Sequence, residues 1–126
     1  MLTLIAGGSG LLGTAIRKAL PGKVVTLDME KPKGGGAFVE CNVTSSTEVF
    51  LACRQVGRVD ALVYAVGRHS ERFWIDPFDV HAWHQTLDVY LHGAFYLLQK
   101  LLPGMVNRRF GRIVLIGSVY GGVAPD

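Results

Sequence analysis

Five short runs of apolar and β-branched residues divide the chain, and glycine, proline or polar residues close each of them. Runs of this length with little polar alternation are typical of strands buried on both faces of a sheet. The pattern therefore predicts five strands, at residues 2–6, 24–28, 37–41, 61–65 and 112–116.

Helical periodicity fills the longer intervals between these runs. Residues 11–20 are predicted to form a helix that the following Pro-Gly pair ends. Ser45 and Glu48 have the spacing of a capping box, which predicts a second helix that runs to about Gln55. Residues 31–36 hold two lysines, a proline and three glycines, and are predicted to form a loop.

A longer helix is predicted from about Asp79 to about Met105, because apolar residues recur through it at helical spacing: Leu87, Leu91, Ala94, Phe95, Leu98 and Leu102. The stripe from Leu91 to Leu102 is expected to lie mostly in the core.

Strands alternate with helices or connectors throughout, which predicts an α/β fold with helices covering a parallel sheet. The chain has 126 residues, of which 49% are hydrophobic and 16 are glycine. This composition suits a buried sheet joined by tight turns and excludes a disordered or fibrous chain. No linker or repeat interrupts the pattern, so a single domain over residues 1–126 is expected.

Charge and hydropathy argue against nucleic acid and membrane as partners. The formal net charge is only +3, and the basic residues are too scattered to form a nucleic-acid surface. No apolar run approaches the roughly 20 residues of a membrane helix. Residues 1–6 are too short an apolar start for a signal peptide, so a cytoplasmic, reducing compartment is expected.

No metal site is predicted. Cys41 and Cys53 do not have the spacing of metal ligands. His81 and His84 can share a helix face, but no convincing third ligand accompanies them, so solvated or packed histidines are favoured.

Residues 7–13 form a Gly-x-x-Gly-x-x-Gly turn between the first strand and the first helix, which is where a dinucleotide fingerprint must lie. Gly7 and Gly10 would leave backbone N–H groups open to a pyrophosphate, and Gly13 would let the helix pack closely on the strand. The positions between them are Ser9, Leu11 and Leu12. The turn predicts cofactor binding, and a purely structural turn is the alternative.

Asp28 ends the second predicted strand, 15 residues after Gly13. A carboxylate there can accept both ribose hydroxyls of NAD and would repel the 2′-phosphate of NADP. Lys31 and Lys33 lie close by and would weaken that preference. NAD is therefore favoured over NADP, and a solvated acid at a strand end is the alternative for Asp28.

Over residues 2–126 the chain resembles the short-chain dehydrogenase/reductase family, because a set of landmarks falls in the family's order. After the glycine turn, Asn42-Val43 resembles the family's Asp-Val beside the adenine ring. Tyr64-Ala65-Val66-Gly67 is similar to its Asn-Asn-Ala-Gly stretch. Tyr90 stands at the position of its catalytic asparagine, and residues 111–119 are similar to the strand that delivers its catalytic serine, here Ser118.

The resemblance implies a Rossmann-type doubly wound parallel sheet, truncated after about five strands and incomplete at its C-terminal side. It implies hydride transfer between a nicotinamide cofactor and an alcohol or carbonyl substrate, with Ser118 as a catalytic residue. It also implies a homo-oligomer joined through the helix at residues 80–105. The implied cofactor-binding residues are Gly7, Ser9, Gly10, Leu11, Leu12, Gly13, Asp28, Asn42, Val43, Ala65, Val66, Gly67 and Tyr90.

The chain also departs from the family pattern. Leu11 replaces a glycine of the largest subgroup, and the family's Tyr-x-x-x-Lys pair is expected about a dozen residues after Ser118, beyond Asp126. Tyr120 does not match that tyrosine, because no lysine stands four residues after it. The favoured interpretation is that this chain is the amino-terminal portion of an NAD-dependent oxidoreductase. The chain alone is expected to be inactive. The alternatives are a nucleotide-binding module or pseudo-enzyme without turnover, and a fragment that folds only against another half or chain.

Overall fold

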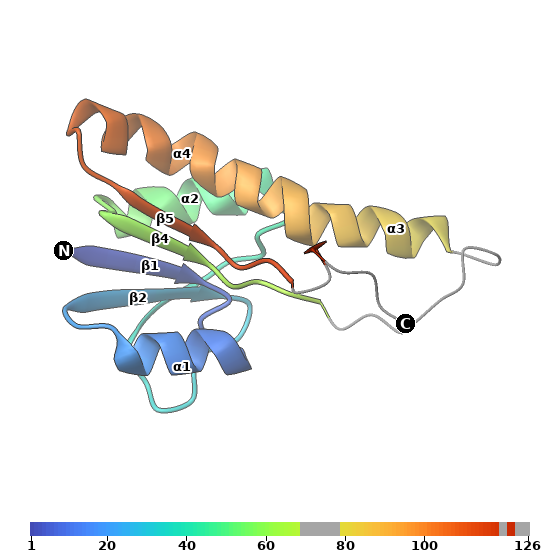
Figure 1. Ribbon diagram of the computed structural model, residues 1–126, viewed down its shortest axis with the longest axis horizontal. Coiled ribbons are helices and arrows are strands. Elements are labelled where there is room, and N and C mark those ends of the chain that lie inside the picture. The colour runs from blue at the N-terminus through green and yellow to red at the C-terminus, as the bar shows by residue number, and fades with distance from the viewer. Residues whose placement is uncertain (69–78, 119–120, 123–126) are drawn as a thin grey trace.

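A computed structural model describes residues 1–68, 79–118 and 121–122 of the chain and shows one parallel five-stranded sheet (Figure 1). Its spatial order is β3-β2-β1-β4-β5, and all four neighbouring pairs are parallel. The strands are β1 (Leu2–Ala6), β2 (Lys23–Asp28), β3 (Ala37–Glu40), β4 (Ala61–Tyr64) and β5 (Arg112–Leu115). Each begins and ends within one residue of its predicted bounds.

Helices cover both faces of this sheet, which confirms the doubly wound α/β prediction (Figure 1). One face carries α1, and the other carries α2 and α4. The helical segments are α1 (Leu11–Ala19), α2 (Ser46–Val56), α3 (Val80–Leu87), the π-helical turn η1 (Asp88–His92) and α4 (Gly93–Asn107). The predicted long helix thus continues through a π-helical turn and ends two residues beyond Met105.

The strand order reverses beside β1. The chain runs outward from β1 through β2 to β3 and then returns to place β4 on the other side of β1. Ala6, the last residue of β1, pairs with Leu27 on one side and with Tyr64 on the other. A crevice opens outside the carboxyl ends of parallel strands at such a reversal, and ligands bind there.

The core between the sheet and its helices is built from fully buried aliphatic side chains. Leu4, Leu27 and Leu62 come from three adjacent strands, and Leu97 comes from α4. Ser45 caps α2 by accepting a hydrogen bond from the N–H of Glu48, as the capping-box spacing predicts.

The predicted core stripe of the long helix is wrong by about one residue. The structure exposes 58% of Leu91, 55% of Phe95 and 43% of Leu102, whereas the buried side chains of α4 are Ala94, Leu97, Leu101 and Met105. Apolar residues surround this helix on most sides, so hydropathy alone does not fix which face packs. Gly93 decides it, because the absence of a side chain there allows the helix to pack closely on Tyr64.

β5 departs from the expectation that every strand is buried. All four of its residues are exposed, including apolar Ile113, Val114 and Leu115. It is the edge strand of the sheet in the described residues, and it pairs with β4 alone.

Leu62→Ala is expected to lower the free energy of unfolding by about 2–5 kcal/mol, because Leu62 is fully buried and its loss leaves a cavity. Leu51→Ala is the matched control. Leu51 is 56% exposed on α2, so its truncation should change stability by less than about 0.5 kcal/mol. Urea unfolding monitored by circular dichroism measures the free energy of unfolding of both variants. An equal loss of stability in the two would contradict the placement of the core.

Candidate functional site

A cavity of about 1030 Å³ lies outside the carboxyl ends of β1, β2, β3 and β4, at the reversal in strand order. The four segments at these strand ends contribute most of its lining, and η1 contributes Val89. The lining residues are Gly7, Ser9, Gly10, Leu11, Leu12, Leu27, Asp28, Met29, Glu30, Cys41, Asn42, Val43, Thr44, Ala65, Val66, Gly67, Arg68 and Val89.

The glycine turn meets the neighbouring backbone closely at two positions. Gly7 has φ +79°, and a Cβ on it would lie 2.6 Å from the carbonyl oxygen of Ala65. A Cβ on Gly13 would lie 2.1 Å from the carbonyl oxygen of Gly7. Only glycine fits both places, so the turn stays folded tightly against β4 and α1.

The amino end of α1 opens directly into the cavity. Gly10 is its N-cap and has no side chain to satisfy the first helical N–H groups. The side chain of Leu11 is 91% exposed and that of Leu12 is 55% exposed. Uncapped N–H groups and the positive end of the helix dipole favour an anionic group such as a pyrophosphate.

Asp28 joins the glycine turn to the end of β2. One carboxylate oxygen accepts a hydrogen bond from the N–H of Ser9 at 3.0 Å, and the other accepts one from the N–H of Met29 at 2.8 Å. The hydroxyl of Ser9 donates to the carbonyl of Glu30 at 2.5 Å. These bonds hold the carboxylate at the cavity wall, where it can still accept further hydrogen bonds from a diol.

The segment after β3 forms the next part of the wall. Asn42 accepts hydrogen bonds from the N–H and the hydroxyl of Thr44, and its own N–H donates to the side chain of Glu48. Burial raises the pKa of the neighbouring Cys41 to about 12, and Glu48 and Cys53 add to the shift. Cys41 is therefore a neutral thiol at neutral pH, and acts as an apolar wall residue rather than a nucleophile.

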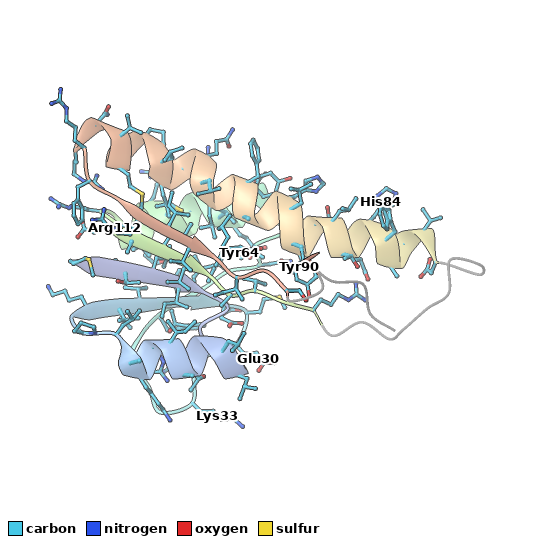
Figure 2. The ribbon with its side chains drawn as sticks, in the orientation of Figure 1. Glu30, Lys33, Tyr64, His84, Tyr90 and Arg112 are labelled. Carbon is cyan, nitrogen blue, oxygen red and sulfur yellow. The ribbon has the colours of Figure 1, made fainter. Side chains whose placement is uncertain are left out.

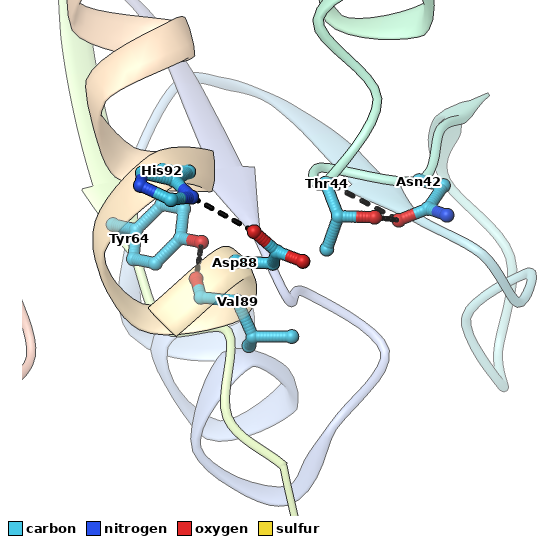
Figure 3. A network of polar contacts seen from close by, with 6 residues as sticks. All are labelled: Asn42, Thr44, Tyr64, Asp88, Val89 and His92. Carbon is cyan, nitrogen blue, oxygen red and sulfur yellow. Dashed lines mark hydrogen bonds and ion pairs between the residues drawn. The ribbon is translucent and has the colours of Figure 1, made fainter. Parts of the chain in front are cut away.

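Two tyrosines connect η1 to β4 and the loop that follows it. Tyr64 points from β4 to η1 and donates its hydroxyl hydrogen to the carbonyl of Val89 (Figure 3). Burial raises the pKa of Tyr64 to about 12, and the nearby Tyr90 adds to the shift, so Tyr64 remains a donor at neutral pH. Val89 is thereby fixed in the cavity lining, directly after Asp88 of the Asp88–His92 pair.

Tyr90 holds the backbone of Arg68. Its hydroxyl oxygen lies 3.1 Å from both the N–H nitrogen and the carbonyl oxygen of Arg68, donating to the carbonyl and accepting from the N–H. Figure 2 shows Tyr90 on the α3–α4 side of the sheet and Glu30 on the α1 side. Tyr90 itself is not among the lining residues.

Eleven of the residues predicted to bind cofactor thus line one cavity: Gly7, Ser9, Gly10, Leu11, Leu12, Asp28, Asn42, Val43, Ala65, Val66 and Gly67. The other two do not line it: Gly13 packs against Gly7 within the turn, and Tyr90 contacts the backbone of Arg68. Ser118 lies beyond β5, outside the cavity lining, and its carbonyl accepts a hydrogen bond from Gly121.

Sequence reasoning missed the other lining residues. Thr44, Met29 and Glu30 follow predicted strands and could have been found by extending each strand-end motif by two residues. Arg68 directly follows the Tyr64–Gly67 stretch and could have been found in the same way. Val89 had no such signal, because its place in the wall depends on how η1 packs against β4.

The described part of the chain contains no group of three or more residues that could hold a metal ion. His81 contacts the side chain of Gln85, and His84 points away from the sheet (Figure 2). None of the helices in the described ranges is long and apolar enough to cross a membrane.

Known proteins match this chain along nearly all of its length. A model of the short chain dehydrogenase family matches residues 3–125. The 3-oxoacyl-[acyl-carrier-protein] reductase MabA of Mycobacterium avium is 33% identical, and the match covers 94% of this chain and 49% of that protein.

Solved structures match the fold equally well. Ligand-free aldohexose dehydrogenase of Thermoplasma acidophilum has a TM-score of 0.90 at 26% identity, covering 99% of this chain and 52% of that one. A short chain dehydrogenase of Leptospira borgpetersenii with bound NAD⁺ has a TM-score of 0.85 at 26% identity, covering 99% and 54%. The chain thus spans about half the length of the proteins it matches.

Gly13→Ala is expected to lower the melting temperature and to disrupt the turn, because its Cβ would lie 2.1 Å from the carbonyl oxygen of Gly7. Gly10→Ala is the internal comparison, since its Cβ would meet that same oxygen at an ordinary 3.4 Å. Differential scanning fluorimetry checks both. A Gly13→Ala variant as stable as Gly10→Ala would contradict the close packing of the turn.

Proposed function

The chain belongs to the short-chain dehydrogenase family, and we propose that it forms the NAD-binding part of an oxidoreductase acting on an alcohol or carbonyl substrate. The observation that carries this proposal is the direct bond between the glycine turn and Asp28 inside one cavity. That bond brings together a place for a pyrophosphate and a place for the adenosine ribose.

The residues of the cavity fit an NAD molecule laid along the carboxyl edge of the sheet. The N–H groups at the start of α1 would hold the pyrophosphate, and Asp28 would accept the ribose hydroxyls. Asn42 and Val43 would border the adenine. A 2′-phosphate placed near Asp28 and Glu30 would meet two carboxylates, which favours NAD over NADP.

The bound nicotinamide would supply the hydride chemistry, while the protein orients the substrate and handles its proton. Ser118 would donate a hydrogen bond to the substrate oxygen. The hydroxyl of a tyrosine ionises with a pKa of about 10. A tyrosine that acts as an acid–base group at neutral pH therefore needs a cation beside it. We propose that the whole protein carries this pair as Tyr-x-x-x-Lys about a dozen residues after Ser118.

The substrate class is proposed only as an alcohol or a carbonyl compound. Two of the relatives that are named for their substrates, a 3-oxoacyl reductase and an aldohexose dehydrogenase, share that reacting group and differ in the rest of the substrate. Each is about a third identical or less, so neither name is transferred.

The long helix is the proposed contact in a homo-oligomer. Leu91, Phe95 and Leu102 form an exposed apolar stripe on η1 and α4, next to the side of the helix that packs in the core. A second copy of the same face would cover it by two-fold symmetry.

Phe95→Asp should then lower the mass measured by analytical ultracentrifugation to that of one chain. An unchanged mass distribution would argue against this contact.

Asp28→Asn is expected to raise the dissociation constant of NADH about tenfold and to narrow the preference for NADH over NADPH, because a charge-assisted acceptor is lost and the 2′-phosphate is repelled less. Glu40→Gln removes one negative charge from the same edge of the sheet, on an exposed residue outside the cavity lining, and should leave both constants unchanged. Titration of the fluorescence of the reduced nicotinamide measures the constants. Equal effects of the two substitutions would count against Asp28 as the ribose acceptor.

Turnover separates the two leading interpretations of the whole protein. A Tyr-x-x-x-Lys pair encoded after residue 126, together with reduction of NAD⁺ by simple alcohols, would support the dehydrogenase. NADH binding without that pair and without turnover would instead support a nucleotide-binding module.

A further inference from the structure

The two ends of the cavity carry opposite charges. Asp28 and Glu30 lie in the wall beyond β2, and Arg68 lies in the wall beyond β4. Because β2 and β4 flank β1 on opposite sides, the glycine turn after β1 separates the acids from the cation. A ligand that spans the cavity therefore meets a carboxylate at one end and a guanidinium at the other.

The position of Arg68 is set at both its backbone and its side chain. The Tyr90 hydroxyl bonds the N–H and the carbonyl of Arg68, and the guanidinium donates to the side-chain oxygen of Gln85 in α3. The amide nitrogen of Gln85 lies 2.8 Å from His81 Nε2. Arg68 is thus held from two successive helical segments, which reduces the entropy lost when it binds a ligand.

No acidic side chain neutralises Arg68 within residues 1–68, 79–118 and 121–122. The ion pairs found in those ranges join Arg58 to Asp60 and His92 to Asp88. Within the same ranges, the Arg68 guanidinium donates a hydrogen bond to the uncharged side-chain amide of Gln85. A guanidinium in a cavity wall that is bonded to a neutral amide retains its attraction for an anion.

We propose that Arg68 is a specificity-determining residue that binds an anionic group of the ligand, a carboxylate or a phosphate, at the β4 end of the cavity. This inference rests on the proposed NAD site. With the ribose at Asp28 and the pyrophosphate at the start of α1, the β4 end would receive the second phosphate of the pyrophosphate or a group of the ligand that lies beyond it. The planar guanidinium can bind two oxygens of such a group at once.

Two sources can supply that anion, namely the pyrophosphate of the cofactor and an acidic group of the substrate. Arg68→Gln is compared with wild type and with Lys18→Gln, which removes the same charge from an exposed residue near the far end of α1. Each form of the 126-residue chain is titrated with NADH. The NADH complexes are then titrated with two matched pairs, dihydroxyacetone phosphate against dihydroxyacetone and pyruvate against methyl pyruvate.

Arg68→Gln is expected to weaken an anionic contact about tenfold, a loss typical of a charge-assisted hydrogen bond. A tenfold loss for NADH itself identifies the pyrophosphate as the anion. Unchanged NADH binding, with a tenfold loss for the acidic member of a pair and none for its neutral member, identifies an acidic substrate. The loss should shrink in high salt, because ions screen an exposed contact.

The inference is overturned if Arg68→Gln and Lys18→Gln match wild type for NADH and for every acidic probe. That result, with NADH still bound by the wild-type chain, leaves the proposed function intact. Failure of the wild-type chain to bind NADH overturns the proposed function and this inference together.

Tyr90 acts through Arg68 as a positioning residue, and Tyr90→Phe tests that role. Hydrogen exchange at the Arg68 amide should accelerate, because its acceptor is removed. The affinity for the anion identified above should fall severalfold, while the neutral probes bind as before. Tyr96→Phe is the control, because the Tyr96 ring packs beside His92 and Phe95. It should change neither the exchange rate of the Arg68 amide nor the affinity for the anion. An unchanged exchange rate in Tyr90→Phe would remove Tyr90 from the proposal.

Discussion

The contact between the glycine turn and the backbone after β4 is the constraint on which the rest of the site depends. Gly7 approaches Ala65 so closely that a Cβ would lie 2.6 Å from its carbonyl oxygen, and Gly13 approaches Gly7 more closely still. These contacts bring the start of α1 to the carboxyl edge of the sheet. Asp28, which bonds the N–H of Ser9, then reaches the same cavity from β2. A bulkier turn would separate the helix end from the carboxylate.

The sequence was sufficient for features that depend on local pattern. Strand bounds, the cap of α2 at Ser45 and the order of strands and helices all follow from short-range hydropathy and turn chemistry. The sequence pattern did not predict which face of the long helix packs in the core, because Leu91 and Phe95 satisfy helical spacing as well as Leu97 and Leu101 do. The deciding fact is that Gly93 meets the Tyr64 hydroxyl, and that contact joins residues 29 positions apart.

The same distinction holds for the site. The residues that follow β1, β2 and β4 could be placed together, since parallel strands bring their carboxyl ends to one edge. Val89 could not, because Tyr64 fixes it by reaching across from β4 to η1. The contact by which Tyr90 holds the backbone of Arg68 could not be predicted either. The π-helical turn is not encoded by any single residue type that sequence patterns detect. It positions Val89 and Tyr90 toward β4, and so joins the helical layer to the cavity.

For the 126-residue chain studied by itself, aggregation is the practical consequence of the exposed fifth strand. An edge strand presents a row of unpaired N–H and C=O groups, and proteins usually protect such edges with charges, proline or bulges. The edge formed by Ile113, Val114 and Leu115 has none of these within the strand, and the charge of Arg112 stands only at its beginning. At high concentration this edge can recruit the same strand of another molecule and extend the sheet between chains. Dilute samples are therefore the conditions under which the cavity of this chain is best studied.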